Sequence, residues 1–307
     1  MNPKVSVIIT THPGRDQLCE KAVKSVLNQT FQDFEIIVVH DGKDTKPNME
    51  KYFTTLGQNI SFISIDHFGN DTRGKNEGIL NAKGTYIAFL DSDNTFRPDH
   101  LQLLVNELDK NLDIDIAYGD RWLTETDQFP AQIGKYSDYE PGHLMVENYI
   151  DTSDVLIRRE ALFYVGGFDE GQKKYIDWNL WVRLEKAGYK FKRVPVVITD
   201  YNIGKDSKSL TKLTENEKRY MENNPGKFAN IPDFDPVDCE IRLPYLGEIH
   251  EPRVAIFTLV YDRHELMEKS LNSLYDSAQY PFEHVVVAQS EKDAEAVQKF
   301  AKGRGIE

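Results

Sequence analysis

One stretch of sequence decides the fold: Gly84-Thr-Tyr-Ile-Ala-Phe-Leu-Asp-Ser-Asp-Asn-Thr-Phe-Arg-Pro-Asp-His-Leu101. Its residues 86–90 are almost wholly apolar, which is typical of a strand buried on both faces of a parallel sheet. The run ends abruptly at two aspartates, Asp91 and Asp93, and Pro98 then fits the first turn of a new helix. The stretch therefore predicts a central strand with two carboxylates at its carboxyl end, where open α/β sheets bind ligands.

The spacing of Asp91 and Asp93 suits a shared ligand. Side chains at positions i and i+2 of a continuing strand lie on one face, so both carboxylates would meet the same ligand. Such hard oxygen donors suit Mg²⁺ or Mn²⁺, ions that usually share their shell with substrate phosphates. The alternative is an acidic turn that only caps the next helix, which is the commoner explanation of an isolated Asp-x-Asp. The buried strand in front of the pair favours the metal site.

Composition limits the class of protein and its partners. With 307 residues, 40% of them hydrophobic, the chain is long enough for one large domain, or one domain plus a smaller unit. The net charge of −13 argues against nucleic acid or an anionic membrane surface as the main partner, because neither offers counter-charge. A polyphosphate ligand would need a metal or local basic residues to be held.

Cysteine content and hydropathy predict the compartment. Cys19 and Cys239 are far apart and lack metal-ligand spacing, which fits a reducing environment without a disulfide framework. No apolar run approaches the length of a membrane span, and the N-terminus lacks a signal-peptide pattern. We expect a soluble, cytoplasmic protein with no transmembrane segment.

Strand and helix signals alternate along the first two thirds of the chain. Apolar and β-branched runs predict strands at 5–10, 34–39, 60–65, 86–90, 114–118, 152–158 and 191–198. Helical spacing of apolar residues predicts helices at 15–29, 48–56, 75–82, 98–110, 160–165 and 177–188. Strand–helix–strand connections of this length imply parallel pairing through right-handed crossovers. The predicted fold is an α/β, doubly wound, mainly parallel sheet flanked by helices.

Near its end the chain repeats its beginning. Residues 15–39 align without gaps onto 263–287 with nine identities in 25, although Gln289 stands where the first copy has Asp41. The expected organisation is a first domain over 1–222, a proline-rich linker over 223–252, and a partial β-α-β copy over 253–307. Such a unit leaves sheet edges uncovered, so it must dock on the first domain, form a homo-oligomer, or continue in a longer natural protein. We favour a fragment of a two-domain polypeptide.

Several groups of residues match a known family in their joint order. They are Lys4-Val-Ser-Val-Ile-Ile-Thr-Thr11, Ser25-Val-Leu-Asn-Gln-Thr-Phe31, Asn76-Glu-Gly-Ile with Ala82-Lys-Gly84, Phe89-Leu-Asp-Ser-Asp-Asn94, Gly166-Gly-Phe-Asp169 and Asp177-Trp-Asn-Leu-Trp-Val-Arg183. Over about residues 4–210 this order resembles the family 2 glycosyltransferases of GT-A fold. The resemblance implies a GT-A domain over 1–222 and a partial second GT-A-like unit after the linker.

The resemblance implies inverting transfer of a sugar from a nucleotide-sugar, usually UDP-linked. Thr10 and Asp41 would hold the base, Asp91 would lie near the ribose, and Asp93 would bind the Mn²⁺ or Mg²⁺ that bridges the diphosphate. A metal there neutralises the charge that the leaving diphosphate gains. Arg73 and Lys75 are candidates for further diphosphate contacts, and the alternative for both is a solvated surface cation.

Asp177 stands where the family usually has the second residue of a Glu-Asp pair, the catalytic base. An inverting transfer needs a carboxylate that takes the proton of the acceptor hydroxyl as the nucleophile attacks. The alternative for Asp177 is an ordinary helix N-cap. Trp178 and Trp181 would offer an acceptor platform by stacking on sugars, although Trp181 falls on the apolar stripe and fits core packing better.

Four departures from the family pattern bear on activity. His40 replaces the first Asp of the usual acidic pair, Lys75 stands where Arg is common, and Ile176 replaces the Glu before the base. The segment 202–209 contains no His where many members use one for metal or diphosphate, and its Lys205 and Lys208 are either substitute cations or part of a mobile loop. The alternative function is therefore a degenerate transferase domain that serves as a non-catalytic carbohydrate-binding or scaffolding module.

The expected acceptor is a glycan, as in polysaccharide biosynthesis, or another molecule with a hydroxyl group. A tandem pair of such domains would suit alternating addition to a glycan, but whether the chain processes a polymer stays open. Nucleotidyl transfer onto a sugar phosphate is disfavoured, since residues 10–16 contain Gly14 but no glycine-rich, Arg-containing loop of the usual kind. The donor sugar and the acceptor depend on residues 124–150 and on the region after Lys205. The pattern there is irregular and leaves both open.

Overall fold

The computed structural model describes residues 2–42, 47–57, 59–69, 71–125, 130–172, 174–202, 255–260, 283–288 and 291–304. The chain divides into two compact units, Met1–Leu246 and Gly247–Glu307, and each is described by itself. The predicted linker at 223–252 lies outside the described residues. Among those residues, no helix is both long enough and apolar enough to cross a bilayer.

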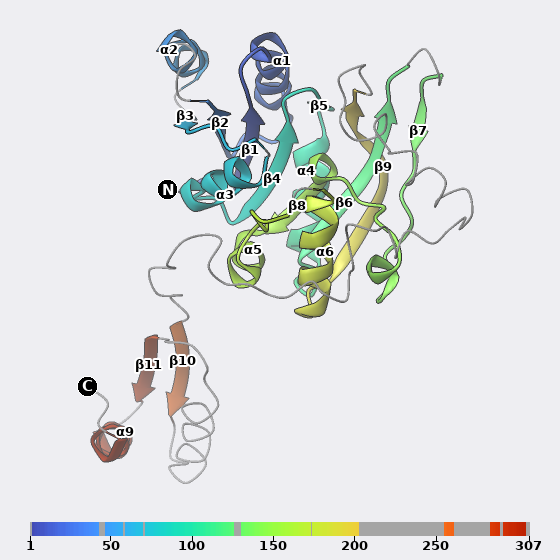
Figure 1. Ribbon diagram of the computed structural model, residues 1–307. Coiled ribbons are helices and arrows are strands. Elements are labelled where there is room, and N and C mark those ends of the chain that lie inside the picture. Colours follow the sequence, from blue (N-terminus) through green and yellow to red (C-terminus); the bar gives the residue numbers. More distant parts are fainter. Residues whose placement is uncertain are drawn as a thin grey trace. The chain divides into compact units, whose positions relative to one another are not determined.

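The first unit alternates strands and helices over most of its length (Figure 1). Its strands are β1 (Val5–Thr11), β2 (Phe34–Asp41), β3 (Ile60–Ile65), β4 (Tyr86–Asp91), β5 (Thr95–Phe96), β6 (Ile116–Leu123), β7 (Gln132–Gly134), β8 (Val155–Arg158) and β9 (Phe191–Tyr201). Its α-helices are α1 (Asp16–Leu27), α2 (Pro47–Leu56), α3 (Asp71–Asn81), α4 (His100–Lys110), α5 (Arg159–Val165) and α6 (Ile176–Lys186). Two short 3-10 helices, η1 (His143–Met145) and η2 (Thr152–Asp154), precede β8.

These strands form one sheet in the order β3-β2-β1-β4-β8-β6-β9-β5, with β7 paired to β6. The first four run parallel, and Thr10 of β1 lies opposite both Val39 of β2 and Asp91 of β4. This register brings the carboxyl ends of β1 and β4 level. The predicted α/β sheet flanked by helices is confirmed.

The direction of β8 was not predicted from the sequence. This strand runs antiparallel to both β4 and β6. The turn η2 in front of it is anchored at the carboxyl end of β4, because the Ser153 hydroxyl accepts a hydrogen bond from the Asp91 backbone N–H at 3.3 Å. The chain therefore enters the sheet from its carboxyl edge and must run against β4.

Two apolar cores cover the two faces of the sheet. One packs α1, α2 and α4 against one face, and the other packs α3, α5 and α6 against the opposite face (Figure 1). Alternate residues of β1 serve the two sides, with Val7 and Ile9 in the first core and Ile8 in the second. Helix α3 approaches especially closely, because a Cβ at Gly78 would lie 2.3 Å from the Ile8 side chain.

The second unit contains a parallel pair of strands, β10 (Ala255–Val260) and β11 (Glu283–Ala288), followed by helix α9 (Glu291–Arg304). A parallel pair requires a crossover connection, as the predicted β-α-β copy demands. The predicted crossover segment lies outside the described residues. The domain boundaries, the repeat and its docking or oligomerisation therefore stay predictions.

Candidate active site

A cavity of about 150 Å³ opens at the carboxyl ends of β1 and β4. It is lined by Thr10, Thr11, His12, Arg15, Asp71, Asp91, Ser92, Asp93, Tyr201 and Asn202. The register of β1 and β4 accounts for this grouping, since it sets the end of one strand beside the end of the other. Three of the residues predicted to hold the donor, Thr10, Asp91 and Asp93, thus share one cavity.

A direct ion pair joins Asp93 to Arg15. The Arg15 Nη1 lies 2.6 Å from the Asp93 Oδ2, and each side chain is 20% exposed. Arg15 directly precedes α1, in the turn that leads from β1, so the parallel sheet carries it to the same edge as Asp93. Sequence analysis did not assign Arg15 to the site. Its place after the first strand was the available signal.

Lys75 is buried beside Asp91. Its ammonium donates to the Asp91 Oδ1 at 3.0 Å and lies 3.7 Å from the Asp71 carboxylate. Burial alone would lower the pKa of Lys75, but these carboxylates outweigh it and raise that pKa. Burial raises the pKa of Asp91 to about 6 although the Lys75 charge opposes the shift. Lys75 is therefore not a solvated surface cation, and its contact with a diphosphate stays a prediction.

Asp41 and Arg73 both contact Phe68, in the loop between β3 and α3, and neither lines the cavity. The two carboxylate oxygens of Asp41 accept hydrogen bonds from the backbone N–H groups of Phe68 at 2.7 Å and Gly69 at 3.3 Å. Arg73 stacks on the Phe68 ring at 4.0 Å from its centroid and pairs with Glu170 at 3.3 Å. The predicted base-binding role of Asp41 would use the lone pairs that these contacts leave.

His40 lies beside Asp41 at the end of β2, where the resemblance leads us to expect a first aspartate. Its side chain is buried and its Nδ1 lies 2.9 Å from the Gly42 carbonyl oxygen. The ring also packs against Phe62. His40 thus belongs to the packing between β2 and β3 rather than to the cavity lining.

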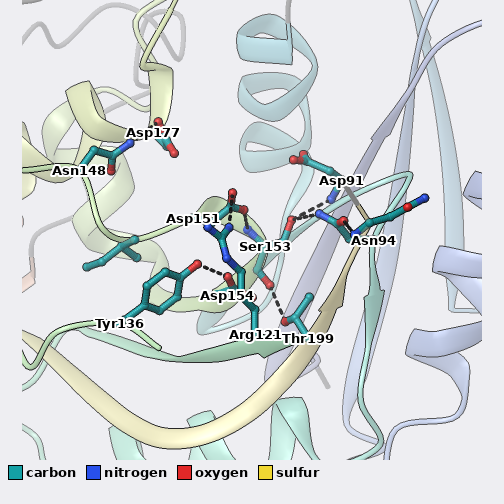
Figure 2. Close-up of polar contacts among 12 residues, drawn as sticks. Asp91, Asn94, Arg121, Tyr136, Asn148, Asp151, Ser153, Asp154, Asp177 and Thr199 are labelled. Atoms are coloured by element: carbon teal, nitrogen blue, oxygen red, sulfur yellow. Dashed lines mark hydrogen bonds and ion pairs between the residues drawn. The ribbon is translucent and has the colours of Figure 1, made fainter. Parts of the chain in front are cut away.

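Asp177 lies in the first turn of α6 and is partly exposed. Its Oδ1 accepts a hydrogen bond from the Trp178 backbone N–H at 2.8 Å. The same oxygen accepts a second hydrogen bond from the Asn148 Nδ2 at 3.3 Å (Figure 2). Burial raises the pKa of Asp177 to about 6, with a further contribution from the negative charge of Asp151. The N-cap of α6 is Tyr175, not Asp177. Asp177 is therefore a carboxylate with a pKa near the range of a general base.

A polar network that includes Asp151 and Ser153 lies at the end of β4, between Asp91 and the pair formed by Asp177 and Asn148 (Figure 2). Asp151 pairs with Arg121 at 3.2 Å and caps η2 through the Ser153 N–H at 3.0 Å. The Ser153 hydroxyl in turn accepts from the Asp91 N–H. Nearby, the Tyr136 hydroxyl donates to Asp154, a fully buried carboxylate whose pKa burial raises to about 7.

The sequence pattern predicts a strand over all of 152–158 and therefore gives no indication of this network. The available signal was the run Asp151-Thr-Ser-Asp154, in which Asp before a short turn is a capping pattern. The structure begins β8 only at Val155. The residues before it form the capped turn that supports the cavity.

The indole rings of Trp178 and Trp181 are both fully buried. Trp178 Nε1 donates to the Leu144 carbonyl at 2.6 Å, and Trp181 Nε1 donates to the Ile150 carbonyl at 2.8 Å. The prediction of an acceptor platform is therefore wrong for Trp178 and Trp181, because neither offers an open ring face. Core packing, the alternative for Trp181, holds for both.

The oxygen ligands at the cavity fit a hard divalent cation that takes much of its coordination shell from a substrate. Asp91 and Asp93 supply carboxylate oxygens, the ligands that Mg²⁺ and Mn²⁺ prefer. Across the described ranges, no cluster of three or more His, Cys, Asp or Glu side chains is arranged to hold a metal by itself. An ion here would thus depend on phosphate and water ligands. The segment 203–209, with Lys205 and Lys208, lies outside these ranges.

Comparison with known sequences places the chain among transferases. The family model described as "Glycosyl transferase family 2" matches residues 6–164. YwdF of Bacillus subtilis, an uncharacterized glycosyltransferase, is 25% identical over 229 residues, 71% of this chain and 82% of YwdF. The O-antigen biosynthesis protein RfbC of Myxococcus xanthus is 23% identical over 305 residues, 94% of this chain but 23% of RfbC. An uncharacterized glycosyltransferase of Rickettsia bellii matches 98% of this chain, which spans 48% of that relative.

Solved structures share the fold, and the predicted GT-A type is thereby confirmed. S. aureus TarS 1–349 in complex with UDP-GlcNAc has a TM-score of 0.57 at 15% identity, covering 72% of this chain and 65% of the TarS chain. The mannosyltransferase PcManGT from Pyrobaculum calidifontis, in complex with GDP-Man and Mn²⁺, has a TM-score of 0.53 at 16% identity, covering 67% of this chain and 59% of PcManGT. This chain thus spans less than two thirds of either structure, and the likeness concerns the fold alone.

Proposed function

Since this chain belongs to glycosyl transferase family 2, we propose that it transfers a sugar from a UDP-sugar to a hydroxyl group of a glycan, with inversion and with help from a divalent metal. One observation carries the proposal. Asp177, a partly exposed carboxylate with a raised pKa, and the Asp91 end of the cavity lie on either side of Asp151 (Figure 2). The charge of Asp151 contributes to the raised pKa of both carboxylates, which supports a base close to the donor cavity.

The donor would lie in the cavity at the ends of β1 and β4. Thr10 and Asp41 would hold the base and Asp91 the ribose, while Asp93, with Asp91, would hold Mn²⁺ or Mg²⁺. A bound ion supplies charge neutralisation for the leaving diphosphate. TarS with UDP-GlcNAc and PcManGT with GDP-Man and Mn²⁺ support such a donor in this fold. RfbC, named for O-antigen biosynthesis, supports a glycan acceptor.

Asp177 would act on the acceptor. Its carboxylate takes the proton of the acceptor hydroxyl while that oxygen forms a bond to the anomeric carbon. The bond from this carbon to the β-phosphate oxygen breaks on the opposite face, and its electron pair leaves with the nucleoside diphosphate. A base with a pKa of about 6 is mostly ionised at neutral pH yet still basic enough to accept a proton. Arg15 and Lys75 bring positive charge to the side of the leaving group.

The test is transfer from a set of nucleotide-sugars by the wild-type protein and by Asp177→Asn. We expect the substitution to lower kcat by about 10²- to 10⁴-fold, the usual contribution of a general base, without weakening nucleotide binding. Asp113→Asn is the matched control, because Asp113 is an exposed carboxylate 3.8 Å from Lys190 and outside the cavity lining. A wild-type protein that binds glycans but neither transfers nor hydrolyses any donor would overturn the proposal and favour the carbohydrate-binding module.

A further inference from the structure

Residues 142–151, which we call the 142–151 segment, are fastened to one helix at three points. The Glu185 carboxylate accepts from the Gly142 N–H at 2.9 Å. The Trp178 indole donates to the Leu144 carbonyl at 2.6 Å, and the Trp181 indole donates to the Ile150 carbonyl at 2.8 Å. All three side chains belong to α6, the helix that carries Asp177. The segment and Asp177 are therefore held by the same element.

Asn148 lies within the 142–151 segment and faces Asp177. Its Nδ2 donates to the Asp177 Oδ1 at 3.3 Å. Its Oδ1 is buried and finds no hydrogen-bond partner in the described part of the chain. A buried carbonyl oxygen without a partner lowers the stability of the folded protein, so stability does not favour asparagine at this position. The contact with Asp177 is the feature of Asn148 that calls for this residue type.

The hydrogen bonds at Asp177 all fall on one oxygen. Oδ1 accepts from both the Trp178 N–H at 2.8 Å and the Asn148 amide at 3.3 Å. From the residues that the structure describes, no hydrogen bond reaches Oδ2. Two donors on one oxygen fix the plane of the carboxylate and leave the lone pairs of the other oxygen for a proton.

We propose that Asn148 is a positioning residue that fixes the Asp177 carboxylate so that Oδ2 meets the acceptor hydroxyl, and that the 142–151 segment is fastened to α6 to hold Asn148 in place. This inference rests on the proposed function, in which Asp177 is the base. The precision of the arrangement matters because a displacement of about 1 Å at a reacting group can cost about 10²-fold in rate.

The charges around Asp177 make the inference measurable. Asp151 faces it from the residue before η2, and Lys75 faces it from α3. Burial and Asp151 raise the pKa of Asp177, whereas the Trp178 N–H, Asn148 and Lys75 lower it. Removal of the Asn148 donor should therefore raise this pKa, and removal of the Asp151 charge should lower it.

The experiment compares Asn148→Ala, Asn148→Asp and Asp151→Asn with the wild type by two readouts. The first is the acidic limb of the pH profile of kcat. The second is a ¹³C NMR titration of the aspartate carboxyl groups, in which the signal missing from Asp177→Asn identifies Asp177. Asn148→Asp keeps the shape of the side chain, so a loss in this variant is not a packing defect. Asn111→Ala is the control, because Asn111 donates to Glu107 at the end of α4.

We expect both Asn148 variants to move the acidic limb of the kcat profile and the Asp177 titration to higher pH. At pH values above the acidic limb, kcat should be lower than in the wild type by about 10- to 100-fold. Asp151→Asn should move both to lower pH, and Asn111→Ala should change neither. An Asp177 titration and a kcat that are unchanged in Asn148→Ala and Asn148→Asp would overturn the positioning role. An inactive wild type would overturn only the proposed function, since the NMR titration needs no turnover and still decides whether Asn148 controls Asp177.

Discussion

The guanidinium of Arg15 lies 2.6 Å from the carboxylate of Asp93, the residue proposed to bind the metal. Both side chains are partly buried, so this pair is stronger than an exposed one. A cation that binds Asp93 would compete with Arg15 for the charge of that carboxylate or share the carboxylate with it. In the proposed function, Arg15 would offset the charge of Asp93 until a metal binds, and would then face the diphosphate.

This competition predicts that Arg15→Ala binds Mn²⁺ more tightly in the absence of nucleotide. A hydrogen bond to a charged group contributes about 1.5–3 kcal/mol, so its removal should lower the Kd of Mn²⁺ by about tenfold or more. The measurement is a Mn²⁺ titration followed by electron paramagnetic resonance. Lys24→Ala is the control, because Lys24 forms an ion pair with Glu20 on α1 away from the cavity lining. Unchanged or weaker Mn²⁺ binding in Arg15→Ala would show that the two cations do not compete.

The buried carboxyl group of Asp154 makes stability depend on pH. Burial and the charge of Asp151 raise its pKa to about 7 from an ordinary value of 3.8. Between about pH 4 and pH 7 the folded protein keeps a proton that the unfolded chain has lost. The free energy of unfolding therefore falls as the pH rises through this window. Asp177 and Asp91, with pKa values of about 6, act in the same direction.

Asp154→Asn should remove much of this dependence. The side chain is then neutral at every pH, and its amide oxygen can still accept the Tyr136 hydroxyl. From pH 5 to pH 8 the variant should gain roughly 2 kcal/mol in unfolding free energy relative to the wild type. Urea denaturation at the two pH values measures the difference. A gap between variant and wild type that is the same at both would contradict the raised pKa of Asp154.

The backbone just before Asp177 is strained. Tyr175 has a φ of 54°, a left-handed conformation that is rare for any residue but glycine, and its ring packs edge-on against Trp178. Tyr175→Gly and Tyr175→Ala both remove the ring, but glycine also relieves the backbone. We expect the glycine variant to be more stable by about 1 kcal/mol in denaturant unfolding.

Tyr52 provides the matched control for Tyr175. It lies inside α2, where glycine should be less stable than alanine by about 0.5–1 kcal/mol. The two positions should therefore rank glycine and alanine in opposite orders. The same order at both positions would mean that the left-handed turn at Tyr175 carries no strain.

The sequence pattern predicted those parts of the site that residues close together in the sequence form. The apolar run that ends at Asp91 and Asp93 identified the central strand and its carboxylates. Both signals, the apolar residues and the abrupt change to polar ones, come from consecutive residues of the sequence. The helix that begins near Asp177 was equally clear from its spacing. What the sequence could not predict was the partner of each group. Arg15 and Asp93 are 78 positions apart, and the Trp178 indole bonds a carbonyl 34 positions earlier.

Asn148 and β8 illustrate the same limit. Asn148 belongs to the irregular region 124–150, where neither period 2 nor period 3.6 is present to fix the face of a side chain. The direction of β8 depends on the anchoring of η2 to the end of β4, a contact between Ser153 and Asp91 that periodicity does not encode. Both features arise from tertiary packing against α6 and β4.

The proposed donor site is tested most directly by a calorimetric titration of UDP, with GDP as the comparison, in the presence and absence of Mn²⁺. We expect UDP to bind in the presence of Mn²⁺, and we expect Asp93→Asn, which keeps the shape of the side chain, to abolish the metal-dependent part of the affinity. Asp113→Asn, remote from the cavity lining, should bind as the wild type does. Absence of nucleotide binding with any metal would contradict a donor site at Asp91 and Asp93.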